Sequence, residues 1–211
     1  TIFFEFNIIM NDYTILDKYI NQKGQIIILI IGMMNSLKSK ISKELLISLN
    51  ENTKTKLKLI NMCNFYKKDK HIKFTDDNNT FNNYDINSNY NFNELNKTIK
   101  EHKNVIIYGS TIDITQIDFQ INFTFLLSST KTRIKECLEK QNIMQNEELI
   151  QKYVKKYYLP YYDNLKEKIK PDKIVNIKKI DETDKEIIDK YTTELFDVLK
   201  HFIDNIVYQS S

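Results

Sequence analysis

Apolar residues alternate along the chain between short unbroken runs and stripes at helical spacing. The unbroken runs predict strands buried on both faces, at 25–31, 55–61, 104–108, 122–127 and 173–177. The stripes predict helices at 11–20, 39–49, 92–102, 131–140, 147–168 and 184–207, with Pro160 interrupting the fifth. Strands that are separated by helices imply a parallel sheet. We therefore expect an α/β fold in three layers, a parallel five-stranded sheet with helices on both faces.

The first predicted strand runs into a loop that carries candidate chemistry. Residues 32–39 read GMMNSLKS, which matches the phosphate-binding pattern G-x-x-x-x-G-K-[S/T] except at its second glycine. Backbone N–H groups at the start of a helix form an anion site, and a lysine and a hydroxyl there would serve the outer phosphates and Mg²⁺. The candidate ATP-binding residues are Gly32, Asn35, Ser36, Lys38 and Ser39, with Ser39 also the metal ligand.

Leu37 stands where the pattern has its second glycine. That glycine lets the backbone approach the phosphates in a left-handed conformation, and a leucine forced into it costs roughly 1–2 kcal/mol. The alternative interpretation of Lys38 and Ser39 is an ordinary solvated first turn of a helix. The strand, loop and helix context favours descent from a phosphate-binding loop.

The composition limits the classes of protein that fit. The net charge of +3 gives no reason to expect a nucleic-acid partner, and 41% hydrophobic residues with 12% aromatics fit a single folded domain. Cys63 and Cys137 have no metal-binding spacing, so we expect reduced thiols. The abundance of Asn, Lys and Ile is typical of an AT-rich genome, as in some large DNA viruses or parasites.

We expect the chain to divide into an N-terminal extension at 1–23 and a main domain at 24–211 that carries the phosphate-binding pattern. The apolar start of the extension lacks a basic leader, and the longest apolar run is too short to cross a membrane. The extension would pack on its own domain or bind a protein partner. These features predict a cytoplasmic protein without a membrane partner, or a virion component if the source is viral.

A polar, Asn-rich connection at 62–90 is long enough to be either functional or disordered. Its carboxylates are candidate ligands of Mg²⁺ or substrate, and they are Asp69, Asp76, Asp77 and Asp85. For the first three, a solvated loop is the favoured interpretation.

Weak motifs in a consistent order extend this picture over about 25–206. They are GMMNSLKS, CNFY at 63–66, NYD at 83–85, YG at 108–109, TRI at 132–134 and the Pro-Tyr segment at 157–162. In this order they resemble the uridine kinase and nicotinamide riboside kinase group of P-loop kinases. The resemblance implies a lid at about 131–147, catalytic roles for Lys38, Asp85 and Arg133, and ATP with Mg²⁺ as cofactors. It also implies that substrate lies near Cys63, Tyr66, Asp85 and Tyr108.

The sequence departs from that group at the positions of the catalytic and metal-binding residues. Cys63 replaces the aspartate that is expected to act as base, and Tyr108 replaces a glutamate that organises metal and substrate. A thiol is mostly protonated at neutral pH, and a phenol does not hold a divalent cation as a carboxylate does. Arg133 is accompanied in the lid only by lysines, which lack the planar fork of arginine. The short connection at 99–105 leaves no place for the pyrimidine-binding hairpin.

These departures lead to competing predictions about function. The first is a uridine or riboside kinase-like P-loop protein with a degenerate site, inactive and serving a structural or binding role. The second is an active ATP-dependent nucleoside kinase that phosphorylates a riboside 5'-hydroxyl, with Asp85 or an acid from 69–77 as base. The third is a nucleotide sensor that binds ATP without turnover.

Overall fold

The structure is a computed structural model, and it describes residues 14–67, 73–76, 79–82, 90–140, 147–178 and 183–209. Its strands are β1 (Ile26–Gly32), β2 (Lys58–Asn61), β3 (Lys73–Asp76), β4 (Asn79–Asn82), β5 (Asn104–Gly109), β6 (Phe123–Ser129) and β7 (Lys173–Ile177). Its α-helices are α1 (Ile15–Lys23), α2 (Lys38–Glu51), α3 (Phe92–His102), α4 (Lys131–Lys140), α5 (Glu147–Tyr153), α6 (Leu159–Ile169) and α7 (Asp184–Gln209). Short 3₁₀ turns lie at Met62–Phe65 and Ile114–Gln116, and a π-helical segment lies at Val154–Tyr158.

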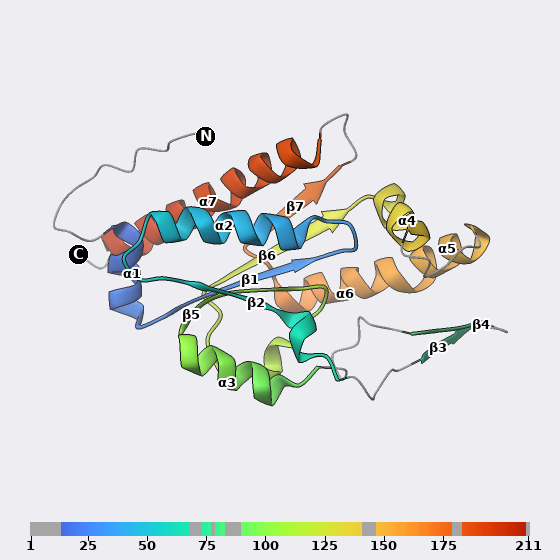
Figure 1. The fold of residues 1–211 in the computed structure, drawn as a ribbon, viewed down its shortest axis with the longest axis horizontal. Coiled ribbons are helices and arrows are strands. Elements are labelled where there is room, and N and C mark those ends of the chain that lie inside the picture. Colours follow the sequence, from blue (N-terminus) through green and yellow to red (C-terminus); the bar gives the residue numbers. More distant parts are fainter. Residues whose placement is uncertain are drawn as a thin grey trace.

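The main sheet is parallel and five-stranded, in the order β2-β5-β1-β6-β7 (Figure 1). β1 is the central strand, and every one of its residues is buried, as the unbroken apolar run predicts. Its register pairs Ile31 with Gly109 of β5 and with Leu126 of β6, so the carboxyl ends of the three central strands finish together. The predicted fold class is confirmed.

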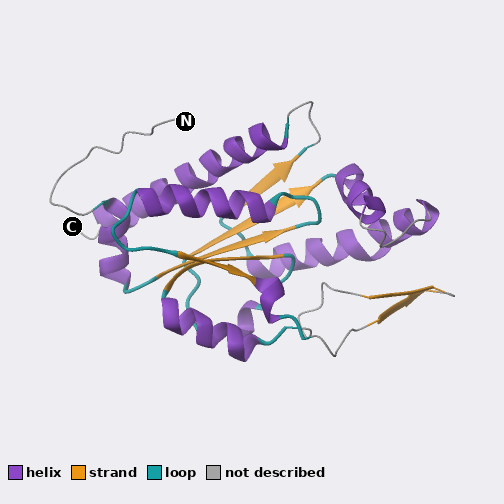
Figure 2. Ribbon diagram, viewed as in Figure 1, coloured by secondary structure: helices purple, strands orange, loops and turns teal. Residues whose placement is uncertain are grey.

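Helices cover both faces of the sheet and make three layers (Figures 1 and 2). Successive side chains of a strand point to opposite faces, so β1 contributes to two separate hydrophobic cores. One core joins Ile26, Ile28 and Ile30 to α1, α2 and α7. The other joins Ile27, Leu29 and Ile31 to α3, α6 and the segment that precedes α6. The loop that leaves β1 therefore starts from the most deeply anchored strand of the domain.

The helix α1 begins at Ile15, four residues later than the sequence predicts, and it packs in the same core as α2 and α7. Its N-cap is Thr14, whose side chain accepts a hydrogen bond from Asp17 N–H while the Asp17 carboxylate accepts from Thr14. The same carboxylate accepts hydrogen bonds from the Thr53 hydroxyl at 2.5 Å and from the N–H groups of Lys54 and Thr55 at 3.2 and 3.1 Å. Asp17 thus ties α1 to the turn that follows α2.

The long connection before α3 contains more structure than a polar loop. It starts with the 3₁₀ turn Met62–Phe65 and includes the antiparallel pair β3 and β4, which forms a separate two-stranded sheet. Lys103 alone separates α3 from β5, so the connection at 99–105 contains no hairpin, as the sequence indicates. Residues 73–76 pair with 79–82 in an antiparallel register, which the weak hydrophobic pattern of this segment does not signal. Asp69, Asp77 and Asp85 lie outside the described residues.

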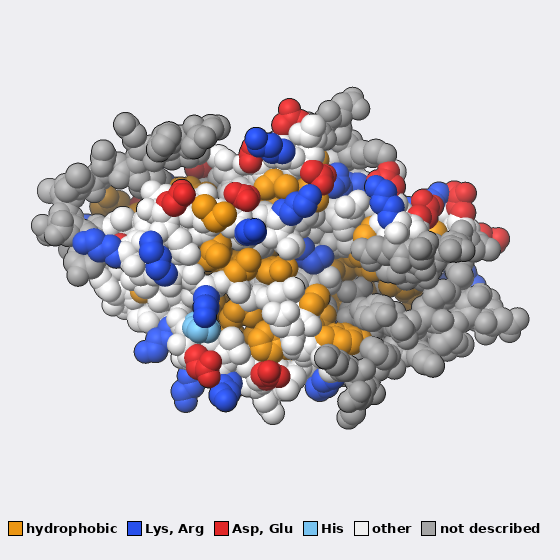
Figure 3. Space-filling model, viewed as in Figure 1, with side chains coloured by type: hydrophobic (Ala, Val, Ile, Leu, Met, Phe, Trp, Pro, Cys, Tyr) orange, Lys and Arg blue, Asp and Glu red, His pale blue; other side chains and the backbone are white. Residues whose placement is uncertain are grey.

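Charged side chains of both signs are interspersed over the face shown in Figure 3, with apolar side chains between them. This mixed surface agrees with the small net charge of the chain. Among the helices that the structure describes, none has the length and apolar character that a membrane span requires.

Candidate functional site

The candidate site lies where the carboxyl ends of β1 and β6 meet. From β1 the chain crosses to β2 on one side of the sheet, whereas from β6 it crosses to β7 on the other side. In open α/β sheets ligands bind at such a switch point, beyond the carboxyl ends of the strands. Two contacts join the loop after β1 to the end of β6: Met33 N–H donates to Leu127 C=O at 2.9 Å, and Ser129 N–H lies 3.3 Å from Met33 Sδ.

The loop after β1 adopts the tight conformation that its pattern predicts. Asn35 and Leu37 both have positive φ, at 54° and 55°, and Leu37 is the residue in the glycine position. The leucine therefore takes the left-handed backbone, at a cost of roughly 1–2 kcal/mol. Gly32 is required for a different reason. A Cβ on Gly32 would lie 2.4 Å from Ser36 Oγ and 2.9 Å from Lys38 Cβ, because the loop folds back over the end of the strand.

The polar side chains of the loop gather at its inner side. Lys38 Nζ donates to Met33 C=O at 3.3 Å. Ser36 is fully buried, and its hydroxyl has no hydrogen-bond partner in the described part of the chain. A buried hydroxyl without a partner is costly, and a phosphate oxygen placed in the loop would supply an acceptor. The backbone, Lys38 and Ser36 therefore fit a bound phosphate group.

Arg133, the only arginine in the sequence, holds the loop from outside. Its Nε donates to Asn35 C=O at 3.1 Å, and Asn35 Nδ2 donates back to Arg133 C=O at 3.0 Å. Its guanidinium also lies 3.7 Å from Asp184 at the start of α7, which pairs with Lys40 at 3.0 Å. The Arg133 side chain is therefore buried between α4, α7 and the loop. The resemblance assigned it to transferring phosphate, but in this arrangement it binds the backbone.

Two tyrosines on the face of the sheet that α3 and α6 cover contact the same loop through their hydroxyls. The sequence did not predict this role. The Tyr158 hydroxyl accepts a hydrogen bond from Met34 N–H at 2.5 Å. The Tyr162 hydroxyl lies 3.1 Å from Gly32 C=O and 2.5 Å from Ser110 C=O. The clustered tyrosines of 153–162 were the available signal, but their helical spacing favoured ordinary packing. They do pack, and they also bind the loop through their hydroxyls.

Cys137 of α4 also faces the loop. Burial raises the pKa of its thiol, and the charge of Lys38 and a hydrogen bond from the Asn35 backbone offset part of the rise. The thiol is therefore neutral near pH 7 and lies beside the Asn35 amide. Sequence reasoning treated Cys137 only as a reduced thiol, because its spacing gives no sign of this position.

The predicted catalytic and substrate positions are only partly brought together. Tyr108 reaches the loop, and Ser39 Oγ donates to its hydroxyl at 3.4 Å. Cys63 is exposed on the 3₁₀ turn after β2, where its N–H donates to Asn61 Oδ1 at 3.0 Å. Tyr66 pairs with Tyr90 through an isolated bridge, with ring centroids 5.5 Å apart. The candidate base, Asp85, lies outside the described residues.

The described residues do not fit a Mg²⁺ site. Ser39, the expected metal ligand, meets the phenol of Tyr108, and neither group supplies the carboxylate oxygens that Mg²⁺ prefers. Within the described ranges, no group of three or more His, Cys, Asp or Glu side chains is placed to hold a metal ion.

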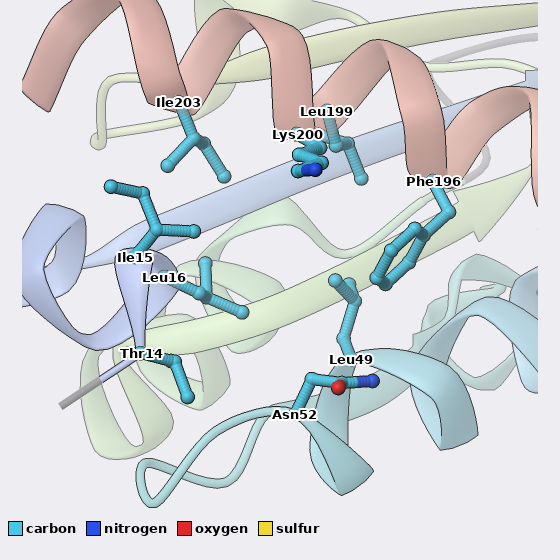
Figure 4. A pocket seen from close by; sticks show the side chains of 9 residues that line it. All are labelled: Thr14, Ile15, Leu16, Leu49, Asn52, Phe196, Leu199, Lys200 and Ile203. Carbon is cyan, nitrogen blue, oxygen red and sulfur yellow. The ribbon is translucent and has the colours of Figure 1, made fainter. Parts of the chain in front are cut away.

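Two hollows lie away from the loop. One is lined by apolar side chains of α1, the end of α2 and α7, including Leu16, Leu49 and Ile203 (Figure 4). It lies at the opposite end of α2 from the phosphate loop. The other, of about 400 Å³, lies between the segment after β5 and α6 and includes Asp113 and Lys168. Asp113 is already used as the cap of the 3₁₀ turn Ile114–Gln116.

A gluconokinase of known structure supports the assignment of the fold. Neither a protein-family model nor a curated protein sequence matches the chain. A gluconokinase from Sinorhizobium meliloti 1021 aligns with a TM-score of 0.52 at 12% identity, over 89% of this chain and 98% of that one. An uncharacterized protein from Eubacterium ventriosum ATCC 27560 aligns with a TM-score of 0.47 at 18% identity, over 85% and 99%. The five-stranded parallel sheet and its flanking helices thus give this chain an α/β fold similar to that of the gluconokinase.

Proposed function

We propose that this protein is a P-loop kinase-like protein that has lost phosphoryl transfer and serves a binding or structural role. The observation that carries the proposal is the contact between Ser39 Oγ and the Tyr108 hydroxyl, 3.4 Å apart. A hydroxyl that would hold Mg²⁺ in an active loop faces a phenol instead of a carboxylate. Phosphoryl transfer depends on the metal to position and neutralise the phosphates, so this substitution removes a central part of the chemistry.

The position of Arg133 supports the same proposal. Transfer requires cationic groups on the equatorial oxygens of the moving phosphoryl group, and arginine is the residue best suited to that task. Here the only arginine is buried and donates to Asn35 C=O, while its guanidinium faces Asp184. Using Arg133 on substrate would require these contacts to break. The exposed Cys63, in place of a carboxylate base, adds a further loss.

The ancestry that we propose is the uridine and nicotinamide riboside kinase group, on the motifs given above. The role that remains would be exercised through the retained phosphate loop or through a protein partner of the N-terminal extension.

An active nucleoside kinase is the second candidate, and the loop itself favours it. Lys38 lies over the loop, Asn35 and Leu37 keep the tight backbone, and Ser36 has a hydroxyl available for phosphate. In this candidate Asp85 is the base and Mg²⁺ is held by groups outside the described residues.

Nucleoside-dependent ATP turnover separates the two candidates. The protein is incubated with Mg-ATP and either uridine or nicotinamide riboside, and phosphorylated product is measured for wild type and for Lys38→Ala. We expect product to stay at the level of the Lys38→Ala control. Turnover by wild type that disappears in Lys38→Ala would overturn the proposal and support the active kinase.

A second variant tests the reason for the loss. Tyr108→Glu combined with Cys63→Asp returns carboxylates to the two positions that the resemblance assigns to catalysis. We expect this double variant to gain stabilisation by Mg-ATP relative to metal-free ATP, measured as a shift in the thermal midpoint. An equal shift in wild type would show that the native groups already bind the metal.

A further inference from the structure

Two consecutive N–H groups of the phosphate loop already have partners from other parts of the chain. Met34 N–H donates to the Tyr158 hydroxyl at 2.5 Å, and the Asn35 backbone is hydrogen bonded to the Cys137 thiol. Backbone amides of such a loop are the groups that bind phosphate oxygens. A phosphate that used these amides would have to displace a phenol hydroxyl and a thiol.

The local structure explains why Tyr158 reaches the loop. Pro160 lies in the first turn of α6 and lacks an N–H, so the preceding turn cannot continue as a regular α-helix. The chain widens there into the π-helical segment Val154–Tyr158, in which Leu159 N–H donates to Val154 C=O five residues back. Tyr158 and Tyr162 then share one face, and their hydroxyls contact the two sides of the strand-to-loop junction. Tyr158 is 2% exposed, so its hydroxyl is directed inward.

The loop nevertheless retains an unused donor. Ser36 is completely buried between Gly32 and Lys38, and its hydroxyl has no partner among the described residues. Tyr158 and Cys137 therefore satisfy the amides at the start of the loop and leave the hydroxyl further along it unsatisfied. A polyphosphate group, which offers several acceptor oxygens, would serve all of these donors together.

We propose that Tyr158 is an internal occupant of the phosphate loop, which competes with the phosphate groups of a polyphosphate ligand for the Met34 amide. Binding of the ligand then requires the Tyr158 hydroxyl to leave, which loosens the α5–α6 segment. The proposal deepens the proposed function, because it rests on the loop as the binding site that the protein retains. It concerns binding and does not depend on whether phosphoryl transfer survives.

The expected size of the effect follows from one hydrogen bond. The ligand must pay for opening the contact, so its apparent affinity is reduced by the fraction of molecules in which the loop is accessible. A net hydrogen bond is worth about 1 kcal/mol, which corresponds to roughly a fivefold change in affinity. Removing the Tyr158 hydroxyl should therefore raise affinity by about that factor.

The experiment measures tripolyphosphate binding by calorimetry without a divalent cation, for wild type and Tyr158→Phe. Tripolyphosphate isolates the loop from any nucleoside site, and the absence of metal isolates it from Mg²⁺ chemistry. Tyr161→Phe is the matched control, because Tyr161 lies only three residues after Tyr158 and its hydroxyl bonds to Thr111. We expect the affinity for tripolyphosphate to rise about fivefold in Tyr158→Phe and to stay unchanged in Tyr161→Phe. Adding Lys38→Ala to Tyr158→Phe should abolish the increase.

Unchanged affinity in Tyr158→Phe, an equal gain in Tyr161→Phe, or no binding by Tyr158→Phe would each overturn the proposal. Hydrogen exchange on wild type gives a measurement that does not require the variant to fold. With saturating tripolyphosphate, amides of 33–39 should gain protection and those of 153–158 should lose it. If the amides of 33–39 gain protection and those of 153–158 do not lose it, Tyr158 does not compete with the ligand for the loop.

The two proposals fail separately. Phosphoryl transfer by wild type would overturn the proposed loss of activity and leave the competition of Tyr158 intact. Tripolyphosphate affinity that is insensitive to Tyr158→Phe would overturn the competition and leave the loss of activity intact.

Discussion

The two ends of β1 are built in opposite ways. At the amino end, Ile26 N–H and Ile27 N–H donate to the side chains of Asn104 and Asn122 at 3.0 and 2.7 Å, and the buried Asp17 nearby accepts several hydrogen bonds. At the carboxyl end, non-glycine residues hold positive φ and the Ser36 hydroxyl has no described partner. Strain and unsatisfied polar groups persist where they serve binding, whereas satisfied networks serve stability. The comparison places a satisfied hydrogen-bond network at one end of the strand and the candidate binding loop at the other.

The largest expected effect on stability comes from removing the hydrogen-bond network of Asp17, near the amino end of β1. Asp17→Asn removes the charge and replaces one acceptor oxygen with a donor, although the Thr53 hydroxyl and the N–H groups of Lys54 and Thr55 still require acceptors. We expect the free energy of unfolding in urea to fall by about 2–4 kcal/mol. The exposed Asp163→Asn is the control and should change it by less than about 0.5 kcal/mol. Equal effects would show that the network adds no stability.

The same network predicts a pH dependence. Burial raises the pKa of Asp17, but the hydrogen bonds from Thr53, Lys54, Thr55 and Thr14 outweigh it and lower the pKa to about 2, from 3.8. A pKa that is lower in the folded state stabilises the protein above the unfolded pKa. That stability is lost as the pH falls through the folded pKa. We expect Asp17 to contribute about 2 kcal/mol at pH 6 and to lose it between about pH 4 and pH 2. The free energy of unfolding in urea, plotted against pH across this range, should have a shallower slope for Asp17→Asn than for wild type. Parallel slopes would contradict the assignment.

A smaller effect is expected at the carboxyl end from Arg133→Lys. The lysine keeps the charge but loses the fork that contacts Asn35 C=O and Asp184 together. We expect a loss of about 1–2 kcal/mol in the free energy of unfolding. The reverse exchange at the exposed Lys131, Lys131→Arg on the same helix, should be close to neutral. If both exchanges are neutral, Arg133 does not hold the loop.

The smallest effect is expected from Leu37→Gly. Relief of the left-handed leucine should return roughly 1–2 kcal/mol, and the lost packing of this half-buried side chain should cost about the same. The net change should therefore stay within about 1 kcal/mol in urea unfolding. Leu46→Gly is the matched control, since Leu46 is also half-buried in α2 but has helical backbone, and we expect it to cost about 2 kcal/mol or more. Equal costs would mean that Leu37 is not strained.

Helical periodicity predicted α7 well but misplaced part of its buried face. A stripe that continues from Leu195 and Leu199 through Phe202 and Ile206 fits helical spacing, yet Phe202 and Ile206 are half-buried, and Ile203 and Val207 are buried instead. The second half of α7 also packs against α1, which turns the covered face toward the next position along the helix. The spacing of apolar residues along one helix does not show whether a second helix, here α1, packs against it.

The fold and the tight conformation of the loop after β1 could be derived from local information. Apolar runs and stripes specify buried strands and amphipathic helices, and the pattern around Leu37 specifies a residue with left-handed backbone. These features depend on residues that are close to one another in the sequence, so the sequence alone is enough to predict them. The partners of the loop depend on tertiary contacts between segments distant in the chain. Arg133 on the Asn35 carbonyl and Tyr158 on the Met34 amide join residues about a hundred positions apart. Only packing of α4 and the α5–α6 segment against the sheet determines which side chains meet the loop, because many tyrosines and lysines of this chain have similar local sequence.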